Sequence, residues 1–457
     1  MNDSLNLSSA LSYMTSHMDH FTNDLIECLK IPSISTLPSS ASDVLSCASH
    51  VKSEMEHVGL RNIQQFDDYG PPILYADYLV DPTKPTLMFY GHYDVQPVDP
   101  LNLWDSPPFE PEIRDGYLFA RGASDNKGMF YAQLKAIESY LKSVGTLPVN
   151  VKFLIEGEEE VGSIGLLQFI NDYSGMCTCD ALLVSDSPMF SDSQPSICTG
   201  FRGLIYLDCH VKSMNHDVHS GQLGGGVPNI IHYISNCISS MKDPFTNKVL
   251  IPGFYDDVKL PPDAFDSSSS IATSHLNNLD QFYSLGDHAD HNFYNNIWYL
   301  PTLDCNGIQS GFVLEGAKTV IPCEASFKLS CRLVADQDPD RIKDLVTSYV
   351  ATFFPSTFSV TVRSLGPLAK PLVVDTTDSY IKTAIKALHD THQTRIIVQG
   401  EGGSIPVLAE FQSLFKVPLV LVGLNAPNDN IHAPNERFKL DHYRNGIEMY
   451  IRYINMV

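Results

Sequence analysis

The chain has 457 residues, a formal net charge of −23 and 43% hydrophobic residues. Because one ordinary hydrophobic core does not organise a chain of this length, we expect two domains. The strong acidity argues against a nucleic-acid-binding protein and against attachment to an anionic membrane, since both need a basic surface.

The first part of the chain alternates helical and strand patterns. Alternation of this kind is typical of an α/β fold with a parallel sheet that is covered on both faces. Residues 96–120 are rich in Pro and Asp and are expected to form a long loop. The predicted helices cover 9–30, 41–58, 128–144 and 164–173, and the predicted strands cover 73–78, 86–90, 149–155 and 181–184.

The pattern changes after about residue 200. Residues 325–334 alternate strictly between apolar and polar side chains, which predicts a strand with one exposed face, on which Arg332 lies. The surrounding order βαββαβ is typical of a small ferredoxin-like domain. Its other predicted strands are 204–211, 302–312 and 358–362, and its predicted helices are 229–241 and 340–354.

Helix–strand alternation resumes at residue 376, with a predicted strand over 417–422 and a terminal helix over 444–454. The middle domain is therefore inserted into the first. We predict a discontinuous domain of residues 1–200 and 376–457 and an inserted domain of residues 201–375. Within the insert, residues 242–300 form an irregular excursion to which the sequence assigns no role.

The cellular compartment is indicated by the cysteines and by the N-terminus. Ten cysteines are dispersed without the spacing of a disulfide scaffold, so reduced thiols are expected. The first residues lack the basic start and apolar core of a signal peptide, and no apolar run approaches the roughly 20 residues that span a bilayer. We expect a cytoplasmic protein without a membrane partner.

Polar side chains follow the apolar strand that begins at Thr86. His92 and Asp94 stand just beyond its end, where a parallel sheet presents residues to a ligand. A neutral imidazole is the commonest metal ligand, and a carboxylate is its usual orienting partner. The alternative is a solvated turn, because a His-x-Asp pair also arises by chance.

Four further strand ends or glycine-rich turns carry polar residues: Asp125, the pair Glu159 and Glu160, Asp186 and His432. An ordinary helix cap is the alternative for Asp125. Five such ends that carry His, Asp and Glu but no Cys indicate a cation, and they suit zinc, manganese or cobalt in a site with open positions. More than four ligands favour two metals that share a bridging carboxylate. One of the two adjacent glutamates would then bind metal while the other takes a proton from water.

These stretches resemble the signatures of a dinuclear zinc metallopeptidase family that includes carnosine dipeptidases, cytosolic nonspecific dipeptidases, acetylornithine deacetylase and succinyl-diaminopimelate desuccinylase. The resemblance runs from about residue 15 to 455, and it is closest to the dipeptidase branch. It rests on Gly-His92-Tyr-Asp94-Val-Gln-Pro, Arg-Gly-Ala-Ser-Asp125-Asn-Lys-Gly, Glu-Gly-Glu-Glu159-Glu160-Val-Gly-Ser and His432-Ala-Pro-Asn-Glu.

The resemblance implies a zinc-peptidase catalytic domain and an inserted lid and dimerisation domain. It implies that His92 and Asp186 hold one metal, that Glu160 and His432 hold the other, and that Asp125 bridges them. The implied cofactors are two divalent ions, most simply zinc, with manganese or cobalt as alternatives.

The resemblance also assigns the remaining roles. Asp94 would steer the His92 ring, and Glu159 would be the general base. His219 of a neighbouring subunit would stabilise the oxyanion, which implies a homodimer through the lid. An ordinary surface histidine and a helix N-cap are the alternatives for His219 and Ser404. The implied substrate contacts are His219, Thr319, Arg332, Gly403, Ser404 and His432.

The sequence therefore predicts a metal-dependent hydrolase of dipeptides or short peptides with a free C-terminal carboxylate. Glu159 would deprotonate a water that bridges the two metals, and Arg332 would grip the substrate carboxylate. One alternative is a deacylase of N-acyl amino acids that uses the same metals and base. A non-catalytic binding protein is the other.

Overall fold

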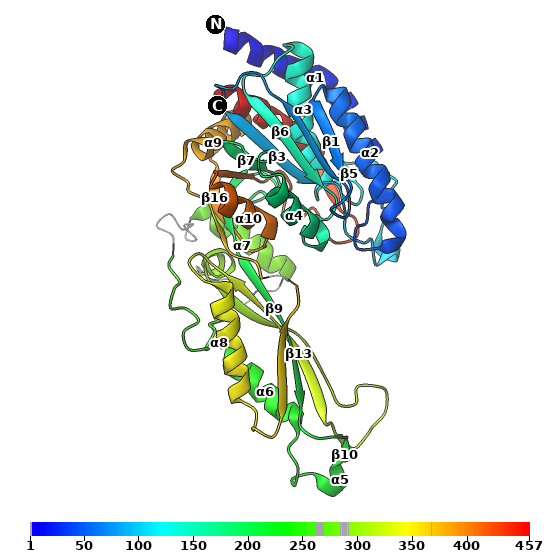
Figure 1. Ribbon diagram of the computed structural model, residues 1–457, viewed down its shortest axis with the longest axis vertical. Coiled ribbons are helices and arrows are strands. Elements are labelled where there is room, and N and C mark those ends of the chain that lie inside the picture. Colours follow the sequence, from blue (N-terminus) through cyan, green and yellow to red (C-terminus); the bar gives the residue numbers. More distant parts are fainter. Residues whose placement is uncertain (1, 261–268, 284, 286–289, 291, 367) are drawn as a thin grey trace. The chain divides into compact units, whose positions relative to one another are not determined.

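The computed structural model describes residues 2–260, 269–283, 285, 290, 292–366 and 368–457 (Figure 1). The chain divides into two compact units. The first unit contains residues 1–199, 374–399 and 410–457, and the second contains residues 200–373 and 400–409. The sequence had assigned residues 400–409 to the first domain. They belong to the second because the N–H of Arg202 donates to Gly403 O and Arg202 Nε donates to Gly402 O.

The first unit is built on a mixed sheet with a parallel centre. Strand β3 pairs in parallel with β6 and β7, and β7 pairs in parallel with β17. Strands β1, β2 and β8 add antiparallel pairs at the two sides. The predicted α/β class is confirmed, and the sheet is parallel at its centre. The strands in spatial order are β1 (Arg61–Phe66), β2 (Ile73–Tyr78), β6 (Asn150–Glu156), β3 (Thr86–His92), β7 (Ala181–Val184), β17 (Leu419–Val422) and β8 (Ser196–Phe201).

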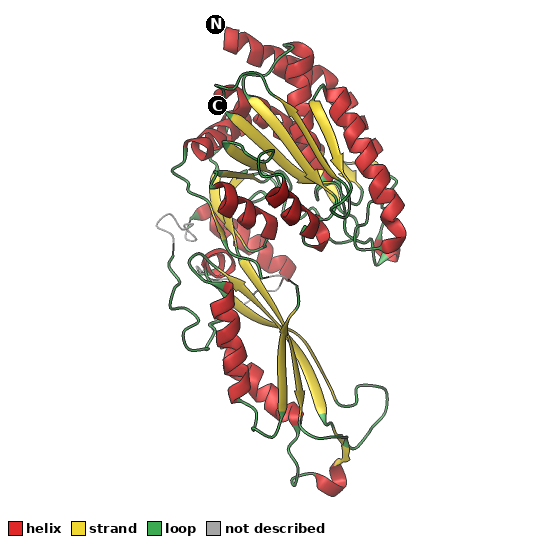
Figure 2. Cartoon of the chain, in the orientation of Figure 1, coloured by secondary structure: helices red, strands yellow, loops and turns green. Residues whose placement is uncertain are grey.

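Helices cover this sheet, as Figure 2 shows. Helix α3 packs between strand β3 and the helices α1 and α11, so nearly all of its residues are buried. This burial includes polar side chains that must find partners inside the helical layer. The helices of the first unit are α1 (Asn2–Leu29), α2 (Ala41–Val58), α3 (Lys127–Ser143), α4 (Ile164–Asp172), α9 (Ser379–His392), α11 (Leu440–Met456) and most of α10 (Pro406–Phe415).

The predicted loop over 96–120 is wrong in part. It contains β4 (Glu112–Arg114) and β5 (Tyr117–Phe119), which form a three-stranded sheet with β18 (Arg437–Lys439). Asp115 and Gly116 both have positive φ in the two-residue turn between β4 and β5, and Asp-Gly is the residue pair that favours such a hairpin turn. The Asp-Gly dipeptide was therefore the overlooked signal.

The second unit contains a four-stranded antiparallel sheet with helices α6 (Ile230–Met241) and α8 (Pro339–Thr352) packed on one face. The ferredoxin-like prediction is confirmed. In β13 the apolar positions are buried and the alternate ones more exposed, but Arg332 is half-buried rather than exposed as predicted. The strand order is β11 (Thr302–Ser310), β13 (Glu324–Leu333), β9 (Gly203–Lys212) and β14 (Ser359–Ser364).

Smaller elements complete the second unit. Strands β10 (Val218–His219) and β12 (Val320–Ile321) pair near the short helix α5 (Ser220–Leu223). The stretch 242–300, predicted to be irregular, contains helix α7 (Ser270–Tyr283), while residues 261–268 and 286–289 lie outside the described residues. Strand β15 (Leu372–Val373) pairs with β8, and β16 (Ile397–Glu401) crosses the boundary between the units. In the described part of the chain, every helix is too short or too polar to cross a membrane.

Candidate metal centre

The parallel strands of the first unit bring polar residues to one edge of the sheet. Strand β3 ends at His92, whose register partner in β6 is Glu156, and Asp186 follows two residues after β7. These strands are apolar and buried along their length. Their carboxyl ends therefore meet at a single edge, which is where an open α/β sheet binds ligands.

Two groups of possible metal ligands lie at this edge. His92, Asp125 and Asp186 offer one ligand atom each, and these atoms lie within 4.8 Å of one another. Asp125, Glu160 and His432 form a second group by the same measure. The five residues predicted as ligands thus lie together, and Asp125 belongs to both groups, as a bridging carboxylate must.

Unpaired atoms in both groups show that the residues fit a cation. His92 Nε2 and Glu160 Oε1 are buried and have no hydrogen-bond partner among the described residues. His92 Nε2 lies 3.2 Å from Asp125 Oδ1, and His432 Nε2 lies 2.9 Å from Asp125 Oδ2 and 3.4 Å from Glu160 Oε2. Imidazole nitrogens and carboxylate oxygens that converge in this way suit borderline ions such as zinc.

The electrostatics of the edge also favour a cation. Burial, and then the negative charge of Asp125, raise the pKa of Asp186 to about 7. Burial raises the pKa of Glu159 well above its usual value, although His92 opposes the shift. Burial would also raise the pKa of Asp125, but the adjacent imidazoles of His432 and His92 outweigh it and lower that pKa. Neighbouring carboxylates oppose each other's ionisation, so a positive ion is needed to keep all of them charged.

Asp94 connects the end of β3 to the turn that carries the two glutamates. Its Oδ1 accepts the backbone N–H of Glu159 at 3.2 Å, and its Oδ2 accepts the N–H of Glu160 at 3.1 Å and the hydroxyl of Ser35 at 2.6 Å. Asp94 Oδ1 also lies 3.3 Å from His92 Nδ1. Asp94 therefore faces the nitrogen of His92 that is turned away from Asp125, as an orienting carboxylate should.

Glu436 was overlooked as a positioning residue. Its Oε2 accepts Arg121 Nη1 at 2.5 Å and the N–H of Gly122 at 3.1 Å, while its Oε1 accepts the N–H groups of Ser124 and Asp125 at 3.0 Å each. Both Glu436 and Arg121 are buried. The ion pair thus fixes the loop that presents Asp125. The only signal in the sequence was the position of this glutamate, four residues after His432.

Asn126 is a second residue whose role the sequence did not reveal. Its Nδ2 donates to the carbonyl of Ser185 at 2.6 Å and to Asp186 Oδ1 at 3.3 Å. Its Oδ1 accepts the N–H of His92 at 3.4 Å. One buried amide thus connects three loops that each carry a candidate ligand.

The predicted substrate residues of the second unit form two separate pairs. His219 accepts the N–H of Gly221 at its Nδ1, and its Nε2 lies 3.5 Å from Thr319 Oγ1. Arg332 Nη1 donates to Ser404 Oγ at 2.7 Å. His219 and Thr319 therefore lie together, and so do Arg332 and Ser404.

The glycine turn beside Ser404 is held by Glu401. The carboxylate oxygen Oε1 of Glu401 accepts the N–H of Gly402 at 2.7 Å and that of Gly403 at 3.1 Å. Burial raises the pKa of Glu401, and burial followed by the charge of Arg332 lowers the pKa of Arg202 to about 10. Two arginines thus lie near the buried carboxylate of Glu401, and the charge of Asp304 also acts on both of them.

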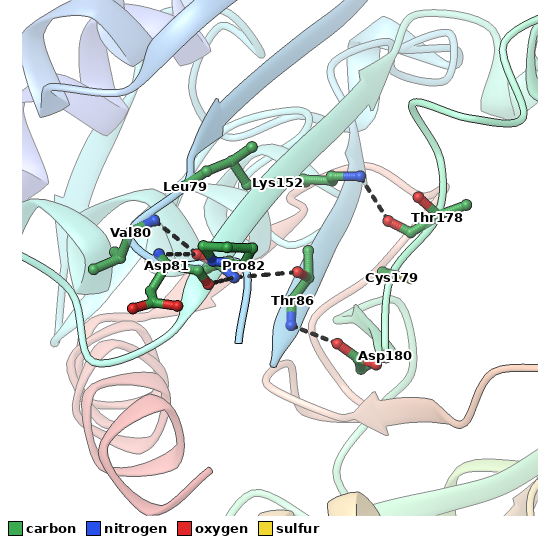
Figure 3. A pocket seen from close by; sticks show the side chains of 10 residues that line it. Leu79, Val80, Asp81, Pro82, Thr86, Lys152, Thr178, Cys179 and Asp180 are labelled. Carbon is green, nitrogen blue, oxygen red and sulfur yellow. Dashed lines mark hydrogen bonds between the residues drawn. The ribbon is translucent and has the colours of Figure 1, made fainter. Parts of the chain in front are cut away.

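A hollow of about 460 Å³ lies elsewhere in the first unit, at the amino ends of β3 and β6 (Figure 3). Its polar groups already satisfy one another. Asn150 Nδ2 donates to the carbonyl of Asp81, Asp180 accepts the N–H of Thr86, and Lys152 donates to two backbone carbonyls. It lies at the opposite ends of these strands from the candidate ligands, and we assign it no part in the chemistry.

The chain is similar to known peptidases over most of its length. A profile of "Peptidase family M20/M25/M40" matches residues 88–456. The chain is 29% identical to the Beta-Ala-His dipeptidase of Homo sapiens, over 98% of this chain and 92% of the relative. It is 29% identical to the Cys-Gly metallodipeptidase dug1 of Schizosaccharomyces pombe, over 96% and 95%. The solved structure of the di-peptidase Dug1p from Saccharomyces cerevisiae superposes with a TM-score of 0.85 at 26% identity, covering 100% of both chains.

Proposed function

The chain belongs to peptidase family M20/M25/M40, and we propose that it hydrolyses dipeptides and short peptides that carry a free C-terminal carboxylate. The observation that carries this proposal is the position of Asp125, which is shared by two groups of His and carboxylate ligands. The dipeptidases among its relatives support the choice of substrate. The chain is accordingly a metal-dependent hydrolase of the dipeptidase type.

The proposed cofactors are two divalent ions, for which zinc is the first choice and manganese or cobalt are alternatives. His92 and Asp186 would hold one ion, Glu160 and His432 the other, and Asp125 both. Bound there, the ions would polarise the scissile carbonyl and lower the pKa of a water molecule.

Glu159 is the proposed general base. It stands next to a ligand in the chain but belongs to neither group of ligand atoms, so its carboxylate is available for proton transfer. Glu159 would take a proton from the attacking water and then give it to the leaving amine. Asp94 accepts the backbone N–H groups of Glu159 and Glu160. It would therefore fix the positions of the base and the ligand relative to each other.

The second unit is proposed to bind the substrate. Arg332 and Ser404, with the N–H of Gly403, would receive its carboxylate, and His432 would contact the substrate from the metal side. Arg332 is eight residues along β13 from Glu324, where the strand begins, so it lies roughly 26 Å from that end of the sheet at about 3.3 Å per residue. Figure 1 shows β10 and α5 at that far end of the sheet.

A dipeptide cannot span this separation, and this supports a shared site. We propose that His219 and Thr319 act on the substrate bound to a partner subunit in a homodimer, and that His219 there stabilises the developing oxyanion. In such a two-fold dimer each subunit would complete the site of the other.

Mixing two inactive variants tests the shared site. His219→Ala and Glu159→Ala should each be inactive alone, whereas exchanged subunits should recover about a quarter of the wild-type rate, because half of randomly mixed dimers are heterodimers with one intact site of two. The rate is measured after subunit exchange, which differently tagged chains would verify. Exchanged dimers without any recovery would contradict action in trans.

Amidation of the substrate tests the carboxylate contact. A dipeptide amide should be hydrolysed with a kcat/KM about 10- to 100-fold lower than the free dipeptide, which is the loss expected for one hydrogen-bonded ion pair. Arg332→Met should lower kcat/KM for the free dipeptide and leave kcat/KM for the dipeptide amide unchanged. Arg363 is an exposed arginine on the edge strand β14. The matched control is therefore Arg363→Met, which should behave as wild type.

The same assay separates the two hydrolase candidates when N-acyl amino acids are added to the panel. Faster turnover of acyl amino acids than of every dipeptide would favour the deacylase. Equal turnover of free and amidated dipeptides would remove Arg332 from its proposed role.

A further inference from the structure

A second cluster of ionisable side chains lies where helices α1, α2 and α3 pack together, outside the candidate metal centre. The ammonium of Lys135 is fully buried and lies 2.5 Å from Asp24 Oδ2, 2.5 Å from Glu54 Oε1 and 2.9 Å from Glu138 Oε2. Burial alone would lower the pKa of Lys135, but the charges of Glu54 and Glu138 raise it, so the ammonium stays protonated. Three carboxylates around one ammonium leave two negative charges to be compensated.

Two histidines stand at the rim of this cluster. His20 of α1 and His57 of α2 have side chains that are 47% and 53% exposed, and their rings are 5.9 Å apart. His57 Nε2 lies 3.8 Å from Glu138 Oε1, and His20 Nε2 lies 3.5 Å from Asp24 Oδ2. One ligand atom from each of His20, His57 and Glu138 lies within 4.8 Å of the other two.

One carboxylate oxygen of Glu138 has no hydrogen-bond partner among the described residues. This oxygen is Oε1, which is buried, whereas Oε2 of Glu138 binds Lys135. The side chain is only 1% exposed, and Oε1 faces the ring of His57. A buried carboxylate oxygen without a partner is costly, so it points to a group that the polypeptide does not supply.

We propose that His20, His57 and Glu138 bind a divalent transition-metal ion, zinc by preference, at a third site on the helical layer. Two imidazoles and one carboxylate are a common zinc ligand set, with a water or Asp24 available as the fourth ligand. Ligand atoms on one tetrahedral zinc ion are about 3.4 Å apart, close to the 3.8 Å between His57 Nε2 and Glu138 Oε1. A divalent ion would also offset the two uncompensated charges.

The neighbouring group of Asp24, Glu54 and Glu138 is not the proposed site. Its oxygens converge on the ammonium of Lys135, which already serves as their cation. The proposed ion lies instead between Glu138 Oε1 and the two imidazoles, and it would cross-link three helices. Protonated histidines are the competing source of positive charge, and the metal count distinguishes them.

Zinc stoichiometry tests the proposal. The wild-type chain and the variants His20→Gln and His57→Gln are dialysed to equilibrium against buffered micromolar free zinc, and bound zinc is counted by mass spectrometry of the metal. Each variant should hold about one zinc ion per chain fewer than wild type. His210→Gln is the matched control, because His210 is a surface histidine paired with Asp208 at 2.8 Å that belongs to no described ligand group. It should bind as much zinc as wild type.

Two further readouts keep the test independent of the proposed function. Dipeptide hydrolysis should be unchanged in His20→Gln and His57→Gln, and the rise in unfolding temperature on adding zinc should be smaller than in wild type. Equal zinc counts in wild type and both variants would overturn the third site. So would loss of zinc accompanied by loss of hydrolysis, which would place the lost ion in the catalytic centre. If the chain does not hydrolyse dipeptides, the difference in bound zinc between wild type and the two variants still tests the third site.

Discussion

Replacing Glu159 with Gln should lower kcat for dipeptide hydrolysis by about 10²- to 10⁴-fold while both metal ions stay bound. The amide keeps the size of the side chain but cannot accept a proton from water. The five proposed ligands remain in place, because Glu159 belongs to neither group of ligand atoms. The measurement combines steady-state kinetics with the metal content of the same preparation.

Glu158→Gln is the matched control for this prediction. Glu158 precedes Glu159 in the chain, but its Oε2 accepts the N–H of Gly165 at 2.8 Å, and the amide oxygen of Gln can accept the same bond. The control should retain near wild-type hydrolysis. If Glu159→Gln instead loses metal, the roles of Glu159 and Glu160 are exchanged, and if it loses neither metal nor activity, another residue is the base.

Much of the candidate centre could be predicted because its signals are local in the sequence. His92 and Asp94 follow an apolar strand directly, and a parallel sheet collects such strand ends at one edge. The alternation over 325–334 likewise predicts β13, because one face of that strand packs in the core of the second unit. These predictions needed no knowledge of distant contacts.

Other features could not be predicted because their causes are distant in the chain. Glu436 and Arg121 are 315 positions apart, and nothing near either residue shows that they form a buried pair. Strand β1 is polar and largely exposed, so it lacks the apolar run by which the other strands were recognised. Residues 400–409 join the second unit through bonds to Arg202 and Arg332, which are far from them in the chain.

The histidines of the proposed third site illustrate the same limit. His20 and His57 lie on different helices, and in the sequence each is one of sixteen histidines. Only helix packing brings them to Glu138, whose burial follows from the position of α3 between the sheet and α1. A ligand set without strand-end or motif signals becomes visible only in three dimensions.

Replacing Glu436 with Ala should have the largest effect on stability. The variant leaves the buried guanidinium of Arg121 without its carboxylate, which should lower the free energy of unfolding by about 3–5 kcal/mol. Urea unfolding of the metal-free protein measures this loss. Glu448→Ala is the matched control, because Glu448 pairs with Arg452 one turn along α11 in a partly exposed position, and it should cost only about 0.3–0.5 kcal/mol.

The role of Glu436 in positioning the metal ligands can be separated from its role in stability. In the variant the N–H groups of Ser124 and Asp125 lose their acceptor, so the zinc concentration for half-maximal hydrolysis should rise about 10- to 100-fold. Adding Arg121→Met removes the stranded charge and should recover part of the stability. It cannot restore the acceptor, so the zinc requirement should stay high. Recovery of both properties together would show that the pair acts on stability alone.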